Sequence, residues 1–173
     1  MITLRPYDDR DCAGITAIYA HHVQWGTASF ETEPPSHAEM RQRFDDIRTQ
    51  HYPILVATDA QDMVLGYGYA SAHKSRYGYR FTVEDSIYIH HEHTQLGIGS
   101  ALLHKLIDEC TTQGYHQMIA VIGDSENHGS VALHAKAGFE QIGIARHLGF
   151  KFGRFIDVVF MQRQLLPASH FTE

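Results

Sequence analysis

The segment 83–103 constrains this chain most, because it reads as a strand, a glycine loop and the start of a helix. Residues 87–89 (Ile-Tyr-Ile) are strand formers, and the loop 95–99 (Gln-Leu-Gly-Ile-Gly) follows them. From Ile98 onward the apolar residues recur at helical spacing. Gly97 and Gly99 allow a sharp turn that leaves backbone N–H groups uncovered. Free N–H donors and the helix dipole both favour an anion there, so the segment predicts a site for a phosphate-bearing ligand.

The glycine pattern does not fit the commoner phosphate loops. No Walker A sequence is present, and Leu102 stands where a dinucleotide loop has its third glycine. A tight strand-to-helix turn without a ligand is the simpler alternative. A second segment favours the ligand site: residues 120–123 (Ala-Val-Ile-Gly) end another apolar strand, Asn127 follows in a loop, and 130–138 reads as a short helix stopped by Gly138.

Composition limits the class of protein. A length of 173 residues with 43% apolar residues predicts a single domain, 1–173, with a sizeable core. The net charge of −6, without a basic run, argues against nucleic acid as a partner. No apolar stretch reaches the ~18–20 residues of a membrane span, and no signal peptide opens the chain. Cys12 and Cys110 fall in predicted helices, so free thiols and a cytoplasmic location are expected.

Histidine is unusually frequent, with 14 residues. The groups at 90–93 and at His21 and His22 invite a metal interpretation. However, Gln95 stands where an H-E-x-x-H motif would need its second histidine, and adjacent histidines on one element point to different faces. Solvated surface histidines and no metal are therefore expected.

The periodicity predicts the element order β-αα-βββ-α-β-α-ββ. Asp8 or Asp9 can cap the first helix, and Ser36 with Glu39 forms a capping box for the second. The order is that of an α/β fold with a mixed central sheet and helices on both faces. The predicted strands are 2–5, 54–57, 63–72, one carrying Glu84, 116–123, 139–146 and 155–165, and the predicted helices run to about 23, 50, 114 and 138.

Six stretches of the chain together resemble a known family. They are 27–34 (T-A-S-F-E-T-E-P), 74–84 with its T-V-E ending, 87–102, 120–123, 130–134 (S-V-A-L-H) and 149–158 (G-F-K-F-G-R-F-I-D-V). In this order they resemble the GNAT superfamily of N-acetyltransferases, and within it the phosphinothricin and methionine sulfoximine acetyltransferases. The resemblance implies the GNAT fold, acetyl-CoA as acetyl donor and a homodimer.

The resemblance also implies how the cofactor is held. The backbone of Ile87, Tyr88 and Ile89 would pair with the pantetheine arm, and Asn127 would hydrogen-bond the same region. The pyrophosphate cradle would be formed by Gln95, Leu96, Gly97, Ile98, Gly99 and Ser100. The chain departs from the family at Thr94, where relatives usually carry Arg or Gln, which predicts some loss of pyrophosphate affinity. Side chains 87–89 can equally be core, and Asn127 can be an ordinary loop residue.

By the same resemblance, Glu84 and His134 are the catalytic candidates. Glu84 would take the proton of an amine that is mostly protonated at neutral pH. His134 would protonate the departing thiolate or share the base role, and a backbone N–H of the strand that carries Glu84 would meet the developing oxyanion. The structural alternatives are a solvent-facing strand residue for Glu84 and a packed helix residue for His134.

The loop 74–79 matches the substrate loop of these relatives. Arg76 and Lys74 suit the anionic or strongly accepting oxygens of a small amino-acid analogue, although a solvated basic loop is the alternative. The expected substrate residues are Phe30, Lys74, Ser75, Arg76, Tyr79, Glu84, Asp85 and Ser86, of which Phe30 could instead be core. Two other readings stay open: acetylation of a protein N-terminus or polyamine, and a non-catalytic acyl-CoA-binding module.

Overall fold

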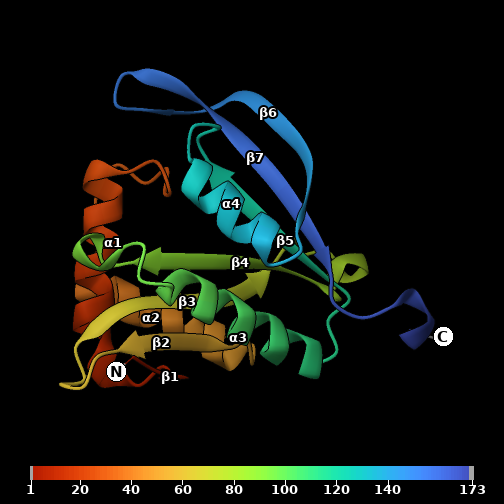
Figure 1. Cartoon of the computed structure of the whole chain (residues 1–173), viewed down its shortest axis with the longest axis horizontal. Helices are drawn as coiled ribbons and strands as arrows, with labels where there is room; N and C mark the ends of the chain where they lie inside the picture. Colours follow the sequence, from red (N-terminus) through yellow and green to blue (C-terminus); the bar gives the residue numbers. More distant parts are fainter. Residues whose placement is uncertain (1, 172–173) are drawn as a thin grey trace.

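A computed structural model describes residues 2–171 of the chain. One seven-stranded mixed sheet runs through it in the order β1-β2-β3-β4-β5-β7-β6 (Figure 1). Only β4 and β5 are parallel neighbours, and the other pairs are antiparallel. The strands are β1 (Thr3–Pro6), β2 (Ile54–Thr58), β3 (Val64–Ala72), β4 (Thr82–Ile89), β5 (Gln117–Gly123), β6 (Glu140–Lys151) and β7 (Arg154–Gln164).

Four α-helices connect the strands in the expected order, so the predicted fold class is confirmed. The predicted capping box at the start of the second helix is also present, since Ser36 N–H donates to Glu39 Oε2 at 2.7 Å and Glu39 N–H donates to Ser36 Oγ at 3.2 Å. Within residues 2–171, none of the helices combines the length and the apolar character needed to cross a membrane. The helices are α1 (Cys12–Trp25), α2 (His37–Thr49), α3 (Ile98–Thr112) and α4 (His128–Lys136), and short 3₁₀ turns are η1 (Asp9–Asp11), η2 (Tyr77–Tyr79), η3 (His91–His93) and η4 (Ala168–His170).

Strand β6 is longer than the sequence predicted. It extends to Lys151 instead of ending near Arg146, and it turns into β7 through Phe152 and Gly153. Both turn residues have positive φ, 52° and 72°, as a tight two-residue hairpin requires. The register of β6 against β7 is irregular between Ala145 and Gly149. This irregularity interrupts the alternation of apolar and polar residues on which a sequence-based prediction depends.

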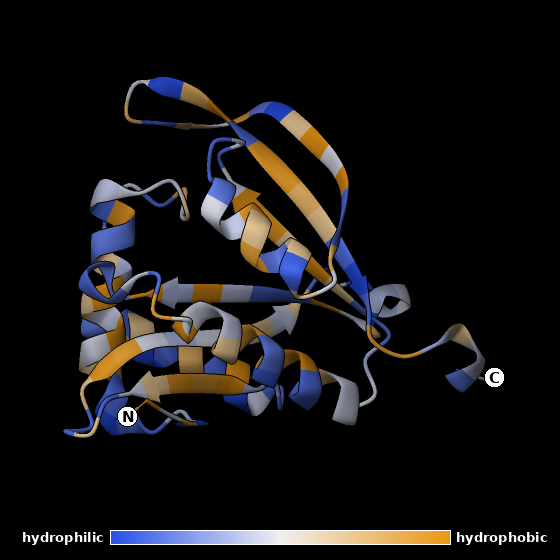
Figure 2. Cartoon of the chain, viewed as in Figure 1, coloured by the Kyte–Doolittle hydropathy of each residue, from blue (hydrophilic) through white to orange (hydrophobic). Residues whose placement is uncertain are grey.

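The sheet separates two apolar clusters. On β2, Leu55 and Ala57 face the cluster built around α3, whereas Ile54 and Val56 face the cluster that includes α1 and α2. The alternation follows from the pleat, which sends successive side chains to opposite faces. Figure 2 shows apolar residues concentrated along the strands, including most of β7. The fold is therefore layered, with α1 and α2 on one face and α3 and α4 on the other (Figure 1).

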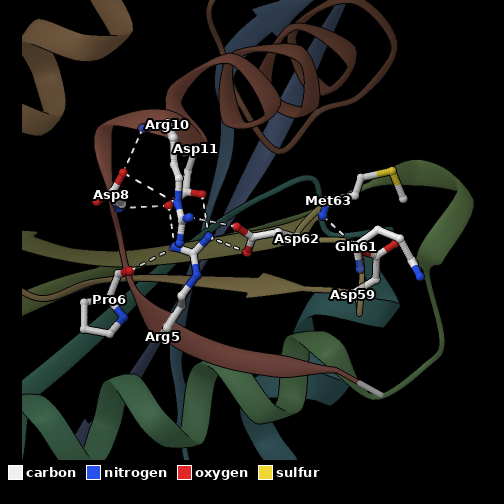
Figure 3. A network of polar contacts seen from close by, with 9 residues as sticks. All are labelled: Arg5, Pro6, Asp8, Arg10, Asp11, Asp59, Gln61, Asp62 and Met63. Carbon is white, nitrogen blue, oxygen red and sulfur yellow. Dashed lines mark hydrogen bonds and ion pairs between the residues drawn. The ribbon is translucent and has the colours of Figure 1, made fainter.

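A polar network fixes the edge of the sheet at β1 (Figure 3). The Arg5 guanidinium donates to both carboxylate oxygens of buried Asp11 at 2.7 and 2.8 Å, and to Asp62 in the β2–β3 turn at 2.9 Å. These hydrogen bonds, opposed by burial, raise the pKa of Arg5 above its ordinary value. Bidentate Arg–carboxylate pairs are geometrically specific, so the network sets how β1, η1 and the hairpin meet.

Strands β4 and β5 pair over only part of their length. Their register ends at Asp85 and Ala120, although β4 continues to Ile89 and β5 to Gly123. On the other side, β4 stays paired with β3 as far as Ile89. The half of β4 that follows Asp85 therefore has an open edge toward β5, in the middle of the sheet.

Candidate functional site

A cleft of about 710 Å³ occupies the place where β4 and β5 diverge. Its walls come from the second half of β4, the N-terminus of α3, the end of β5 and α4. Most of the predicted cofactor residues line it. They are Ile87, Tyr88, Ile89, Gln95, Gly97, Ile98, Gly99, Ser100 and Asn127, whereas Leu96 does not line the cleft and is 60% exposed.

The N-terminus of α3 opens into this cleft as the glycine loop predicted. Gly97 precedes the helix in the left-handed conformation, with φ 79°, and Gln95 also has a positive φ of 63°. The first helical hydrogen bond runs from Ala101 N–H to the Gly97 carbonyl at 3.0 Å. The N–H groups of Ile98, Gly99 and Ser100 therefore have no acceptor within the helix and are available to an anion.

Asn127 is the N-cap of α4. Its Oδ1 accepts from Ser130 N–H at 3.2 Å, and the residue lines the cleft. Its carbonyl oxygen is thus occupied by the helix, while its amide N–H₂ remains a possible donor. The loop position predicted from the sequence carries both a structural and a potential binding role.

Glu84 and Asp85 are neighbours on β4 and point to opposite faces of the sheet. Glu84, which does not line the cleft, accepts a 2.7 Å hydrogen bond from His73 Nδ1. The Glu84 and His73 side chains are partly exposed, at 29% and 19%. No other hydrogen bond within residues 2–171 occupies Glu84, so its second oxygen is free to accept a proton.

Asp85 lies with His134 on the side of α4. His134 Nε2 is 2.9 Å from Asp85 Oδ2, and both side chains are almost fully buried at one end of the cleft. Asp85 was grouped with the expected substrate residues, but here it contacts the catalytic candidate on α4 and not the exposed loop. Glu84 and His134 have separate partners and no hydrogen bond joins them, which separates the two candidate proton-handling groups.

The loop 74–80 is exposed next to Glu84. Lys74, Ser75 and Arg76 extend into solvent, and within the described residues neither cation forms an ion pair. The Tyr79 ring packs edge-on against His73, with centroids 5.8 Å apart. Since His73 also contacts Glu84, the loop is linked to the candidate base through His73.

Phe30 fills a space that two glycines leave open. A side chain on Gly149 would overlap the Phe30 ring, and one on Gly123 would overlap the Thr27 carbonyl oxygen. Lys151 is buried and donates to the carbonyls of Gly26 and Ser29 at 2.8 and 2.6 Å. The segment 26–30 is thereby fixed to the β6–β7 hairpin. Ala28 from this segment lines the cleft.

Three residues of this region were missed by the sequence analysis. His22 was expected at the surface, but it is half-buried and its Nε2–H donates to the Ile89 carbonyl at 2.9 Å, and burial lowers its pKa. His73 follows β3 directly and could have been placed near Glu84 by extending the β3–β4 hairpin. Lys151 lies in the stretch 149–158 that carries the family resemblance, but its burial was not predicted, because a lone lysine near a turn is usually solvated. Within residues 2–171 no three His, Cys, Asp or Glu side chains are grouped to hold a metal ion.

Replacing Gly123 with alanine should displace the segment 26–30. The added Cβ meets backbone, which cannot rotate away, and overpacking of this kind costs roughly 1–3 kcal/mol. The melting temperature should fall by roughly 2–4 °C for each kcal/mol of lost stability in a chain of this size. The matched control is Gly143→Ala on β6, where a Cβ would have no neighbour within 4 Å. Equal melting temperatures for the two variants would contradict the proposed constraint.

Comparison with known proteins places this geometry in context. The sequence profile of the Acetyltransferase (GNAT) family matches residues 15–139. The chain is 48% identical over 163 residues to phosphinothricin N-acetyltransferase of Alcaligenes faecalis, which covers 94% of this chain and 82% of that protein. It is 41% identical over 157 residues to L-methionine sulfoximine/L-methionine sulfone acetyltransferase of Pseudomonas aeruginosa, covering 91% of each.

Solved structures agree with the sequence relatives. The crystal structure of a GNAT superfamily phosphinothricin acetyltransferase from Sinorhizobium meliloti, in complex with AcCoA, superimposes with a TM-score of 0.95 at 46% identity. The similarity covers 99% of this chain and 92% of that one. The likeness thus extends over nearly the whole sheet and both helical layers.

Proposed function

The chain belongs to the GNAT family and is an acetyltransferase, and from this premise we propose that it acetylates the α-amine of a small amino-acid analogue, with acetyl-CoA as donor. L-phosphinothricin, methionine sulfoximine and methionine sulfone are the proposed acceptors. One observation carries the substrate assignment: the Glu84–His73 pair adjoins an exposed loop in which Lys74 and Arg76 form no ion pair with any of residues 2–171. Relatives with these acceptors in their names support it.

The cleft fits acetyl-CoA. The free N–H groups at the start of α3 suit a pyrophosphate, and Gly97 and Gly99 keep side chains out of its way. The open edge of β4 offers backbone groups of Ser86–Ile89 to an extended pantetheine arm, as an added strand would use them. Two similar solved structures contain acetyl-CoA, which supports acetyl-CoA as the donor.

Glu84 is the proposed general base. An α-ammonium group must lose a proton before its nitrogen can attack a thioester carbonyl, and Glu84 Oε2 is free to take it directly or through one water. His73 donates to Oε1 and holds the carboxylate in one orientation. A backbone N–H on the open edge of β4 is the proposed donor to the developing oxyanion.

Transfer is proposed to be direct, without an acyl-enzyme. Cys12 and Cys110 are both buried and free, and burial raises the pKa of Cys110 to about 12. A thiol in this state supplies little thiolate, which is the nucleophilic form. Two reduced, buried thiols also agree with the proposed cytoplasmic location.

A homodimer is part of the proposal. The β6–β7 hairpin carries four large apolar side chains, Leu148, Phe150, Phe152 and Phe155, each more than half exposed. Exposed apolar patches are typical of protein interfaces, and a second copy of the chain is the proposed partner. The whole described chain would then act as one catalytic domain per protomer.

A substrate panel tests the function. Release of free CoA thiol from acetyl-CoA should be measured with phosphinothricin, methionine sulfoximine, methionine sulfone, spermidine and a peptide with a free N-terminus. The proposal expects the three amino-acid analogues to be preferred. Preference for spermidine or the peptide would show that the acceptor is a polyamine or a protein N-terminus instead. Acetyl-CoA binding without turnover on any acceptor would favour a non-catalytic binding module.

Gly99→Val should remove most of the stabilisation by acetyl-CoA. A ligand at about 100 times its Kd stabilises the native state by about 2.7 kcal/mol, or roughly 5–10 °C here. A Cβ at Gly99 makes only ordinary contacts, 3.4 Å from Leu133 and 3.7 Å from Ile89. The variant should therefore fold, while its methyl groups crowd the pyrophosphate. The measurement is the melting temperature with and without acetyl-CoA, with Gly143→Val as the control, and a full shift in folded Gly99→Val would exclude this cradle.

A further inference from the structure

His93 lines the cleft just before the pyrophosphate cradle in the sequence. It is the last residue of η3, two positions ahead of Gln95, where the cradle begins. Its side chain is half-buried. Within residues 2–171 neither of its ring nitrogens has a hydrogen-bond partner, and the ring forms no ion pair. Both nitrogens are therefore available to a ligand in the cleft.

The backbone turns sharply between His93 and α3. Gln95 and Gly97 both have positive φ, 63° and 79°. His93 and the start of α3, with its free N–H groups, consequently line the same cleft. Those N–H groups act as fixed dipoles, whereas a histidine adds a full positive charge when it is protonated. Thr94 also lines the cleft, but its short, neutral side chain supplies no such charge.

Three further histidine rings pack beside His93. The ring of His90 lies 5.1 Å from that of His93, and His91 stacks on His90 at 4.7 Å and on His21 of α1 at 3.9 Å. His90 Nδ1 accepts from Glu92 N–H at 3.3 Å, so that nitrogen carries no hydrogen and the ring is neutral. Burial, together with the charges of His91 and His93, lowers the pKa of His90. Positive charges within this stack repel one another, so a charged ring is accommodated best when an anion lies beside it.

The other charged or titratable groups along the cleft come from α1, β4 and α4. His22 of α1 donates to the Ile89 carbonyl, and burial lowers its pKa, so its ring is neutral. Lys136 of α4 lines the cleft and forms no ion pair with any of residues 2–171. Of the acidic side chains in this range only Asp85 lines the cleft, and it is paired with His134. A phosphate therefore meets no unpaired carboxylate along these walls.

We propose that His93 binds the pyrophosphate of acetyl-CoA and takes up a proton as the cofactor binds. The inference rests on the proposed placement of acetyl-CoA in the cleft. The protonated ring donates a charge-assisted hydrogen bond to a phosphate oxygen, and the phosphate charge in turn favours the protonated ring. Since the ordinary pKa of histidine is about 6.5, most rings are neutral near pH ~7.5, and the proton comes from solvent. Affinity for the acetyl donor is thereby coupled to pH.

Calorimetric titration with 3′-dephospho-acetyl-CoA tests this coupling. The probe keeps the pyrophosphate and lacks the 3′-phosphate, whose own second pKa of about 6 would add to the proton balance. Binding enthalpies measured in two buffers of different ionisation enthalpy give the number of protons taken up. The wild type should take up about half a proton or more near pH ~7.5, and its Kd should rise about four- to eightfold from pH ~6.5 to ~8.

Two substitutions of His93 separate its charge from its shape. His93→Gln keeps a hydrogen-bond donor but cannot be charged, so proton uptake should disappear and Kd should rise severalfold near pH ~6.5 and little near pH ~8. His93→Arg carries a permanent charge, so binding should stay tight and independent of pH. The matched control is His128→Gln, at a side chain that is 79% exposed and outside the cleft. Lys136→Gln removes a charge that does not titrate in this range, so it should leave the pH dependence of Kd as in the wild type.

The outcomes separate this proposal from the proposed function. Proton uptake that persists in His93→Gln, or that falls equally in His128→Gln, would overturn the role of His93. Uptake with acetyl-CoA but not with the dephospho probe would assign His93 to the 3′-phosphate and overturn the pyrophosphate contact. Wild-type binding without proton uptake would overturn the proposal even if the His93 variants failed to fold. If the wild type binds no acetyl-CoA at all, the proposed donor itself is wrong.

Discussion

Glu84→Gln should lower kcat by about 10²–10⁴-fold near neutral pH, which is the usual contribution of a positioned general base. Glutamine keeps the size of the side chain, and its carbonyl oxygen can still accept from His73. The variant should therefore fold and bind acetyl-CoA as the wild type does. What it loses is the ability to take a proton from the substrate ammonium group.

The pH dependence identifies this loss as a loss of base. As pH rises, more of the acceptor amine is already deprotonated, so the deficit of Glu84→Gln should shrink. The measurement is kcat at saturating acetyl-CoA from about pH 6.5 to 9, with Glu92→Gln in the exposed turn η3 as the control. Near-full turnover of Glu84→Gln at neutral pH would exclude Glu84 as the base.

Arg76→Ala should lower kcat/KM for methionine sulfoximine by about one to two decades. Removing a charge-assisted hydrogen bond costs roughly 1.5–3 kcal/mol, and this converts to kcat/KM when the contact persists into the transition state. Affinity for acetyl-CoA should not change, since Arg76 lies outside the cleft. A polyamine acceptor predicts the opposite, because removing a cation would ease its approach.

The matched control lies in the same loop. The Arg80 guanidinium sits over the rings of Tyr77 and Phe81, 4.2 and 4.4 Å from their centroids. Arg80→Ala therefore removes the same charge from the loop without removing the side chain proposed to meet the substrate. The kcat/KM values of both variants and the wild type should be compared on methionine sulfoximine and on spermidine. Equal losses for the two variants on sulfoximine would reduce the role of Arg76 to general electrostatic attraction.

The fold could be predicted from the sequence because its strongest signals are local. The Ser36–Glu39 capping box, the glycine loop before α3 and the alternating strands each act within a few residues, and each is present in the structure. The β6 extension was missed because a bulge breaks the alternation near His147, which has a positive φ of 54°. The glycines and the lysine in 149–153 also favour the prediction of a loop over that of a strand.

The candidate site could be predicted only in part from the sequence, because its contacts join residues that are far apart in the chain. The contact of Asp85 with His134 joins positions 49 residues apart, and that of Lys151 with Ser29 joins positions 122 apart. No local pattern encodes such contacts. The period of two along β4 does predict that Glu84 and Asp85 face opposite ways. Both residues are among the expected substrate residues, and the alternation places them in separate pairs, Glu84–His73 and Asp85–His134.

Because of that alternation, the residues on the two faces of β4 can change independently during evolution. In the proposed function, acceptor selection belongs to the face with Glu84 and to the exposed loop beside it, whereas Asp85 and His134 lie on the other face, toward α4. Within residues 2–171, no side-chain hydrogen bond joins the Glu84–His73 pair to the Asp85–His134 pair. The two faces of one strand, β4, would therefore allow the range of acceptors to change while the binding and reaction of the acetyl donor stay the same.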